Sequence, residues 1–444
     1  MNRAFLEYYH CPEKFADFRL DPQRQDGAEP GYFSFGPGNI LHGKVGSEGR
    51  ESAAGLLADA ATRVRIEGRA CILPFDPTEV ANNLRLERYM DRAAKPVWKR
   101  AVRGLYYALR PAFPVSFRRH LQKAWLKGWD KTPFPRWPVD RSVDQMFATL
   151  MRFALQASGE ARIPFIWFWP EGKSSCAVMT HDVETDAGRR FAGALMDIND
   201  SYGIKSSFQL IPDARYVVSD DDLAAIKGRG FEANVHDLKH DGHLYDSHEK
   251  FEESAARINQ FGERFGSKGF RSAVLYRNQE WFGALKFSYD MSVPNVAHLD
   301  PQRGGCCTVM PYFVGDLLEI PVTATQDYTL FHVLGTHLHD LWQKQISQIM
   351  EQHGLISFIV HPDYLDTEDA LKSYKALLAH LSELRAQAAV WIALPGEVDT
   401  WWRHRSEMKL VAEGAGWRVE GPEAERATVA YATLKDDKLA YQFV

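Results

Sequence analysis

The sequence predicts an α/β protein whose central part is a barrel-like or doubly wound domain. Between about residues 167 and 394, short apolar runs alternate with amphipathic stretches, which is typical of repeated strand–helix units. Before this part, strand-like pieces mix with helical stretches, and after it apolar and polar residues alternate with a period of two. We therefore expect an N-terminal α+β region over 1–165, an α/β domain over 166–402 and a small C-terminal β-strand appendage over 403–444.

The N-terminal region contains two strand-like pieces and one clear helix start. The strands are expected at Tyr32–Phe35 and Val64–Ile66. A helix is expected over Pro77–Met90, because a proline opens it and Glu79 lies in its first turn.

The central domain is expected to contain seven strands with helices between them. The strands are predicted at Cys176–His181, Ser206–Ile211, Phe231–His236, Gly269–Leu275, Leu317–Val322, Ile356–His361 and Ala389–Leu394. The helices are predicted at Gly188–Tyr202, Leu223–Lys227, Ser247–Phe265 and Leu371–Gln387. In the appendage, strands are predicted at Met408–Glu413, Trp417–Glu420, Ala427–Lys435 and Leu439–Val444.

Composition and motifs exclude several classes of protein. The longest apolar runs are far shorter than the roughly 18 residues of a membrane-spanning helix, and the amino terminus has no secretory signal pattern. Five cysteines, an odd number with no Cys-x-x-Cys pair, predict a reducing compartment and a cytoplasmic location. Neither a dinucleotide fingerprint, a P-loop nor a Gly-x-Ser-x-Gly elbow is present.

Polar residues gather at the ends of the predicted strands. Asp182 and Glu184 follow the first strand and, two residues apart in an extended segment, project to the same side. His236 and His240 follow the third strand with a spacing that lets both reach one ion. Two histidines and one carboxylate leave open positions for water, which indicates a catalytic rather than a structural metal site.

Two further strand ends carry charged or titratable side chains. Arg271 closes the fourth predicted strand, where its planar guanidinium can orient a carboxylate through hydrogen bonds. His361 follows a fully apolar strand and is therefore expected at its mouth rather than in the core.

The motifs at these strand ends, taken in order along the chain, resemble those of the polysaccharide deacetylase family, also called carbohydrate esterase family 4 or the chitooligosaccharide deacetylase homology domain. The resemblance covers roughly residues 170–400 and implies a distorted (β/α)7-type barrel. The motifs that carry it are Thr180-His181-Asp182-x-Glu184, His236-x-x-x-His240, Phe270-Arg271-Ser272, Tyr289-Asp290 and Ile359-Val360-His361-Pro362.

The resemblance implies a bound divalent metal, with zinc as the first candidate and another transition metal as the alternative. His236 and His240 match the family's metal-binding histidines. Many members have two adjacent acids in the first motif, whereas Val183 stands at the second of these positions here. The nearest carboxylate is Glu184, which becomes the third expected ligand.

The resemblance also implies catalytic roles. Asp182 matches the catalytic base, and Arg271 matches the arginine that orients it, with Asp290 as the acid expected to steady that arginine. His361 matches the general acid. Ser272 lies where backbone groups of the family line the substrate.

A second segment expected to touch substrate is Gly304–Gly305, because glycines let the backbone approach a ligand closely. A simple turn is the alternative interpretation of this pair.

The expected function is metal-assisted hydrolysis of an amide bond, namely deacetylation of an N-acetylated sugar or of a glycan-biosynthesis intermediate. One alternative is a hydrolase of a non-sugar amide or ureide within the same family. Another is a catalytically silent glycan-binding or scaffold protein, which the departures at Val183 and Ala273 suggest.

The segment 91–136 is strongly basic, with 12 Lys and Arg residues against two acids in a chain of net charge −5. Tryptophans and tyrosines are interleaved with these cations, which favours contact with an anionic membrane surface or a phosphorylated lipid carrier, and hence a peripheral membrane location. A solvated helical face is the alternative. Nucleic acid is not expected as a partner, because the protein is acidic overall and has no recognisable binding motif.

Overall fold

The fold is described by a computed structural model that covers residues 1–22, 29–46, 49–90, 126, 128–336, 340–414 and 416–443. Among these residues, no helix combines the length and the apolar character needed to cross a bilayer. Residues 91–125 and 127 lie outside the described residues, and with them most of the basic segment 91–136. Its contact with a membrane surface or lipid carrier stays a prediction, as does the cytoplasmic location.

The centre of the molecule is a curled, nine-stranded sheet, and the α/β class of this part is confirmed. The strand order is β12-β13-β11-β10-β9-β8-β7-β14, and β15 also pairs with β7. All neighbours are parallel except β12 and β13. The strands are β7 (Ser175–Val183), β8 (Ser207–Leu210), β9 (Glu232–His236), β10 (Gly269–Arg271), β11 (Tyr289–Asp290), β12 (Tyr312–Val314), β13 (Leu317–Glu319), β14 (Leu355–Ile359) and β15 (Val390–Ile392).

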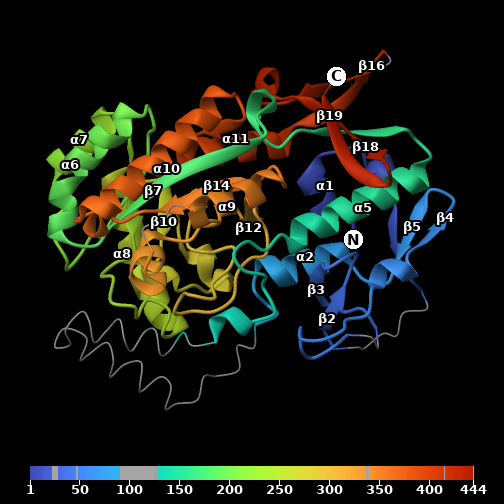
Figure 1. Cartoon of the computed structure of the whole chain (residues 1–444), viewed down its shortest axis with the longest axis horizontal. Helices are drawn as coiled ribbons and strands as arrows, with labels where there is room; N and C mark the ends of the chain where they lie inside the picture. Colours follow the sequence, from blue (N-terminus) through green and yellow to red (C-terminus); the bar gives the residue numbers. More distant parts are fainter. Residues whose placement is uncertain are drawn as a thin grey trace.

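Strand β7, the long strand near the middle of Figure 1, organises this sheet. Its residue Cys176 pairs with β14 on one edge and with Trp391 of β15 on the other. Further along, Thr180 pairs with β14 on the first edge and with Ser207 of β8 on the second. Strands β15 and β8 therefore share one edge of β7, with β15 beside its amino-terminal half.

Helices connect the parallel strands, and their starts follow local capping chemistry. The helices are α6 (Asp186–Ser201), α7 (Asp220–Gly228), α8 (His248–Phe265), α9 (Asp340–Met350), α10 (Glu368–Ala386) and α11 (Pro395–Glu407). The side chains of Thr185, Ser219, Ser247 and Thr367 each accept a hydrogen bond from a backbone N–H of the first turn that follows. Ser219 and Asp222 complete a reciprocal capping box at α7.

The sheet differs from the expected one in two places. Strands β11 and β12 were not predicted, because two- and three-residue strands are too short to show a periodic pattern. The strand expected over Gly269–Leu275 ends at Arg271, since Val274 and Leu275 take up left-handed backbone conformations with φ of 57° and 53°. This turn redirects the chain immediately after Arg271.

The described residues of the N-terminal region form short strands and three α-helices. These are α1 (Arg3–Tyr9), β1 (Phe18–Leu20), β2 (Gly31–Ser34), β3 (Ile40–Gly43), β4 (Arg65–Glu67), β5 (Ala70–Leu73), α2 (Pro77–Arg85), α5 (Ser142–Ser158) and β6 (Arg162–Ile166). Helix α2 starts where expected, because the Asp76 side chain accepts hydrogen bonds from two N–H groups of its first turn. It ends at Arg85, five residues before the expected end.

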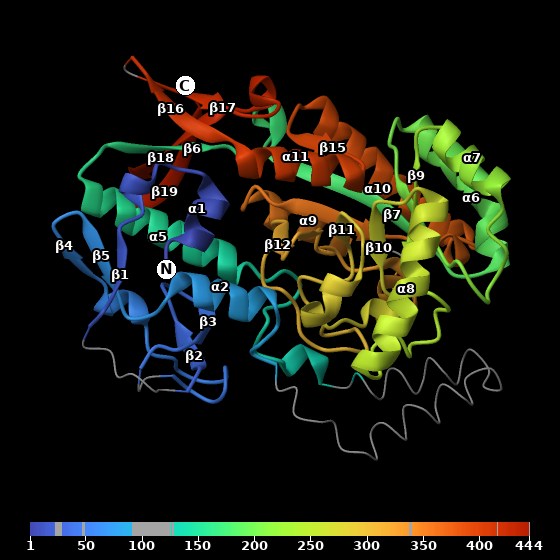
Figure 2. The ribbon, with the colours of Figure 1, turned by 180° about the vertical axis from the view of Figure 1, so that it is seen from behind.

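The C-terminal residues form four strands, as the period-two pattern predicts. They are β16 (Lys409–Glu413), β17 (Gly416–Glu420), β18 (Val429–Lys435) and β19 (Lys438–Phe443). Strand β18 also pairs antiparallel with β6, so the last strands join a sheet that begins before the central domain. Figure 2 shows these strands beside α1 and α5, at the opposite end of the molecule from α6 and α7.

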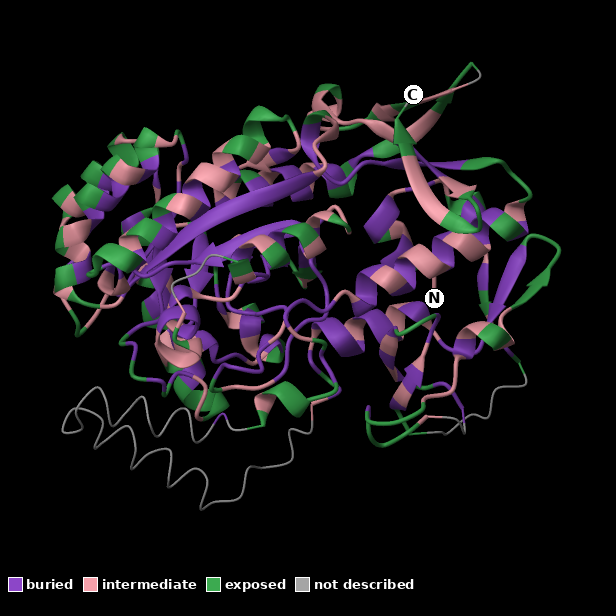
Figure 3. Ribbon diagram, in the orientation of Figure 1, coloured by how far each residue is buried: buried purple, intermediate pink, exposed green. Residues whose placement is uncertain are grey.

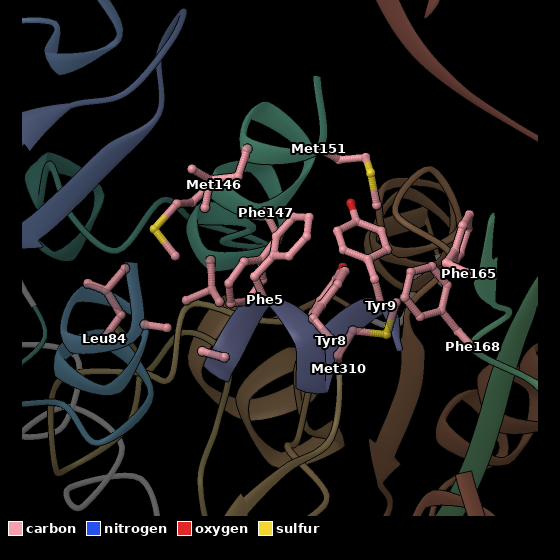
Figure 4. Close-up of a cluster of buried hydrophobic side chains, with 14 of the residues drawn as sticks. Phe5, Tyr8, Tyr9, Leu84, Met146, Phe147, Met151, Phe165, Phe168 and Met310 are labelled. Atoms are coloured by element: carbon pink, nitrogen blue, oxygen red, sulfur yellow. The ribbon is translucent and has the colours of Figure 1, made fainter. Parts of the chain in front are cut away.

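Two large groups of buried apolar side chains hold the molecule together. Figure 3 shows buried residues all along β7. One group lies between the central sheet and its helices. The other joins the N-terminal region to β18 and α11 and extends under the sheet to Leu355 and Leu318. Figure 4 shows part of this second group, in which Phe5, Tyr8 and Phe147 pack with rings 4.7 to 6.4 Å apart.

A fully buried ion pair also links the two regions. Arg277, on the loop that follows β10, donates from Nε to Glu87 Oε2 at 2.8 Å and from Nη2 to Glu87 Oε1. Glu87 follows helix α2, and its Oε1 also accepts the N–H of Gly305 at 2.6 Å. The exposed fractions are 2% for Glu87 and 3% for Arg277, so each charge depends on the other for its solvation.

Candidate metal centre and catalytic site

The candidate site lies at the carboxyl ends of the central parallel strands. Thr180 and Asp182 stand two residues apart on β7 and share a face, and Glu184 follows the strand directly. His236 is the last residue of β9. Left-handed conformations at Asp237 and His240, with φ of 58° and 55°, turn the chain back so that His240 approaches His236, with ring centroids 4.8 Å apart.

Three of these side chains form a group that can hold a metal ion. One ligand atom each from Glu184, His236 and His240 lie within 4.8 Å of one another. The His236 Nε2 is buried and makes no hydrogen bond, which is costly for a polar atom without a ligand, and the buried His240 Nε2 faces Glu184 Oε1. The His236 Nδ1 lies 3.1 Å from the Arg271 carbonyl oxygen, and donation there leaves the Nε2 lone pair free for an ion. This donor set therefore fits a divalent metal of the borderline class, such as zinc.

Glu184 is held in place by residues that follow β14. Its backbone N–H donates to the Asp363 carboxylate at 2.9 Å, and its Oε2 accepts from the Tyr364 hydroxyl at 3.2 Å. Its Oε1 lies 3.1 Å from His240 Nε2. Burial would raise the pKa of Glu184, but His240 and His361 outweigh it and hold this pKa well below its usual range. The carboxylate is thus ionised and available as a ligand.

Asp182 is oriented by Arg271. The Nη1 of this arginine donates to Asp182 Oδ1 at 2.6 Å and to the Thr180 hydroxyl at 2.7 Å, while its Nε donates to the Met291 carbonyl at 2.9 Å. Burial opposes ionisation of Asp182, but Arg271 and His236 lower its pKa below the ordinary value. Asp182 Oδ2 lies 3.8 Å from His236 Nε2, beside the metal-ligand group.

His361 lies on another side of the same group and is paired with Asp327. Its Nδ1 is 2.6 Å from Asp327 Oδ1, and its backbone N–H donates to Asp327 Oδ2 at 2.7 Å. Burial would lower the pKa of His361, but Asp327 outweighs it and raises this pKa to about 10. The His361 Nε2 lies 3.7 Å from Glu184 Oε1. A protonated imidazole next to the metal-ligand group can act as a general acid.

The expected contact between Asp290 and Arg271 is not among the hydrogen bonds of the described residues. Asp290 pairs in register with Phe270, so its side chain points away from the face that carries Arg271. Its carboxylate accepts the backbone N–H and the hydroxyl of Ser292 and lies beside Glu319. Burial raises the pKa values of both acids, and the proximity of Asp290 raises that of Glu319 further.

The three expected substrate-binding residues lie in different surroundings. Ser272 directly follows Arg271 and has a buried hydroxyl without a hydrogen bond. Gly304 and Gly305 contact the N-terminal region instead of the site. The Gly305 carbonyl oxygen accepts a hydrogen bond from the Tyr89 hydroxyl at 2.7 Å, and the Gly305 N–H donates to the Glu87 carboxylate. A side chain at Gly305 would collide with the Asn295 backbone, so close packing explains this glycine.

Sequence reasoning missed three residues of the site, namely Asp327, Asp363 and Tyr364. Asp363 and Tyr364 come directly after His361-Pro362, and inspection of that strand end would have found them. Asp327 lies on a segment without a strand of its own, between β13 and α9. Asp327 and His361 are 34 residues apart in the sequence, so no local sequence pattern could have predicted their contact.

Comparisons with known proteins give fold neighbours only. No family model matches the sequence, and no curated protein matches it. The chain is similar to a "putative polysaccharide deacetylase" from Mycobacterium smegmatis (17% identity, TM-score 0.44, 56% of this chain and 98% of that one) and to PuuE allantoinase (12%, 0.40, 53% and 92%). It is also similar to the peptidoglycan deacetylase PdaC from Bacillus subtilis (11%, 0.33, 52% and 93%).

Two of these three neighbours are described as deacetylases, of a polysaccharide and of peptidoglycan. Because the identities and TM-scores are low, the function proposed below is inferred from the residues of the site.

Proposed function

We propose that the protein is a metal-assisted amide hydrolase that removes an acetyl group from an N-acetylated amino sugar. One observation carries this proposal: the group Glu184, His236 and His240 lies between an ionised carboxylate, Asp182, and a protonated imidazole, His361. Amide hydrolysis needs a base to take a proton from water and an acid to give one to the departing nitrogen. Here Asp182 and His361, the candidate base and acid, both lie beside the metal-ligand group.

Glu184, His236 and His240 would hold the metal. A divalent ion bound there would polarise the amide carbonyl and lower the pKa of a bound water. Asp182 is placed to accept the proton of the attacking water, and Arg271 keeps this carboxylate ionised and fixed. His361 is placed to donate its Nε2 proton to the nitrogen as the carbon–nitrogen bond breaks, while Asp327 holds the opposite ring nitrogen.

Aromatic side chains beside His361 support a sugar as substrate. The rings of Tyr328, His332 and Tyr364 lie 5.2 to 5.3 Å from one another, and Tyr364 is 4.9 Å from the His361 ring. All three are half-buried and therefore accessible in part. Aromatic rings with a polar tip suit the combined apolar and hydroxyl surface of a sugar ring.

The decisive experiment combines metal analysis of the purified protein with an assay for acetate release from N-acetylated amino sugars. We expect about one divalent ion per chain and acetate release that chelation abolishes. Hydrolysis of a ureide such as allantoin, without acetate release from sugars, would favour the non-sugar alternative. Absence of a stoichiometric ion after metal loading would instead favour the silent scaffold.

Replacement of Asp327 by Asn tests the role of His361 through pH dependence. A general acid works only while protonated, so activity is lost as pH rises through its pKa, which Asp327 holds at about 10. In Asp327→Asn this support disappears, and we expect the alkaline limb of kcat/KM to move down toward the ordinary histidine value of about 6.5. An unchanged alkaline limb, measured across the pH range, would contradict the role of His361.

Replacement of Glu184 by Gln tests the third metal ligand. The substitution keeps the shape and the Tyr364 contact but removes the charge, so metal affinity should fall by about tenfold to a hundredfold. Titration with a fluorescent chelator measures it. Glu249→Gln, an exposed acid in the first turn of α8, is the matched control and should bind metal normally.

A further inference from the structure

A pocket opens at the opposite end of the central sheet from the metal-ligand group. Its volume is about 460 Å³, within the range of small-molecule sites. It lies where β15 pairs with the first half of β7, next to the start of β9. Glu232 begins β9 and His236 ends it, so four residues, or roughly 13 Å, separate this pocket from the candidate metal centre.

The floor of the pocket is a fixed polar network. Glu232 accepts the Tyr289 hydroxyl at 2.8 Å on one oxygen and the Gly396 N–H, at the start of α11, at 2.9 Å on the other. The Asn234 amide donates to the Tyr289 hydroxyl at 2.8 Å and to the Ser207 hydroxyl at 2.7 Å. These groups orient one another and are therefore preorganised to meet a ligand.

The walls combine an indole face with balanced charges. Trp391 of β15 is half-buried, and the Arg426 guanidinium lies 5.7 Å from its ring and 3.0 Å from Glu423. Lys268 is exposed and forms no ion pair with any described residue. Among the described residues, three cations and three carboxylates line the pocket: Lys227, Lys268, Arg426, Glu232, Glu397 and Glu423.

This composition selects the chemistry of a ligand. An anion would meet three carboxylates and a cation would meet three basic groups, so neither gains a net attraction. A neutral hydroxyl, in contrast, both donates and accepts, and can use lysine donors and glutamate acceptors together. The indole of Trp391 suits an apolar ring face.

We propose that this pocket is a binding site for a neutral sugar, separate from the catalytic site. It would hold a neighbouring part of a glycan, or a free saccharide, without contacting the reacting amide. The proposal rests on the pocket alone and does not depend on the proposed deacetylase activity.

Calorimetric titration with cellobiose tests the proposal, because this disaccharide is neutral and contains no amide that the catalytic site could hydrolyse. We expect binding with a Kd of about 1 mM, and weaker binding of glucose 6-phosphate and of glucosamine. Trp391→Ala should weaken cellobiose binding by about fivefold or more, and so should Lys268→Glu. Because Lys268 is exposed, its replacement should leave the fold intact, so weaker binding by this variant reflects the pocket itself. Trp417→Ala, a half-buried tryptophan outside the pocket, is the matched control.

A double variant at the metal centre, His236→Ala with His240→Ala, separates the two sites. Cellobiose should bind it as it binds the unaltered protein, and hydrogen exchange should slow at residues 390–401. No binding at about 10 mM cellobiose would overturn the proposal. Binding that the metal-centre variant abolishes, or that both pocket variants leave unchanged, would overturn it too, as would tighter binding of either charged sugar.

Discussion

The Asp182→Asn variant should hydrolyse the amide at least about a hundredfold more slowly than the unaltered protein, while keeping its metal. The asparagine has the same shape and can still accept the Arg271 hydrogen bond, but it cannot take a proton from water. Single-turnover acetate release and metal analysis on the same sample measure the two quantities separately. Because Asp182 does not belong to the metal-ligand group, its metal content should change little.

Asp241→Asn provides the control for this variant, since Asp241 is exposed and follows His240 directly. It should keep full activity. If Asp182→Asn loses the metal while Glu184→Gln keeps it, the roles assigned to these two acids are reversed. Full activity of Asp182→Asn would exclude it as the base.

The double variant His236→Ala with His240→Ala should lose both metal and activity. It removes two of the three ligands, and a metal contributes several kcal/mol to such a reaction, so we expect a fall of about a thousandfold or more. Inductively coupled plasma spectrometry and acetate release are the measurements. The comparison variant, His243→Ala with His248→Ala, alters two exposed histidines of the following segment and should keep both properties.

Full activity of the metal-free double variant would rule out a metal-assisted mechanism. Far-ultraviolet circular dichroism checks that the double variant is folded. We expect a native spectrum, because truncation of the two side chains leaves the backbone hydrogen bonds of β9 intact.

The sequence predicts the site better than it predicts the surroundings of the site. Asp182, His236 and His361 could be placed because each stands at the end of an apolar strand, and parallel strands bring these ends to one edge. The pairing of Asp327 with His361 could not be placed, since it depends on the path of a loop. The orientation of Asp290 required the register of β10 and β11, and no local pattern reveals the register of a two-residue strand.

Outside the central sheet, the sequence predicts individual strands and helices but not which of them pack or pair with one another. The period-two pattern located β18, yet nothing in it indicated that its partner would be β6, more than 260 residues earlier. Likewise, the glycines at 304 and 305 suggested close approach to a ligand. The close approach exists, but it is to the Asn295 backbone and to Glu87.

The buried pair of Glu87 and Arg277 has a consequence for anyone who wishes to cut the protein into parts. A fragment that starts at residue 166 would retain Arg277 inside the loop after β10 but lose Glu87, the carboxylate that accepts hydrogen bonds from both its Nε and its Nη2, and removing one partner of such a buried pair costs about 3 to 5 kcal/mol. The same cut would strip β18 of β6 and expose Phe168 and Tyr441, which now pack against Tyr9 and Phe165. The central sheet therefore does not stand as an independent folding unit, because residues 1–90 supply part of the core packed beneath it, and we expect the excised fragment to aggregate.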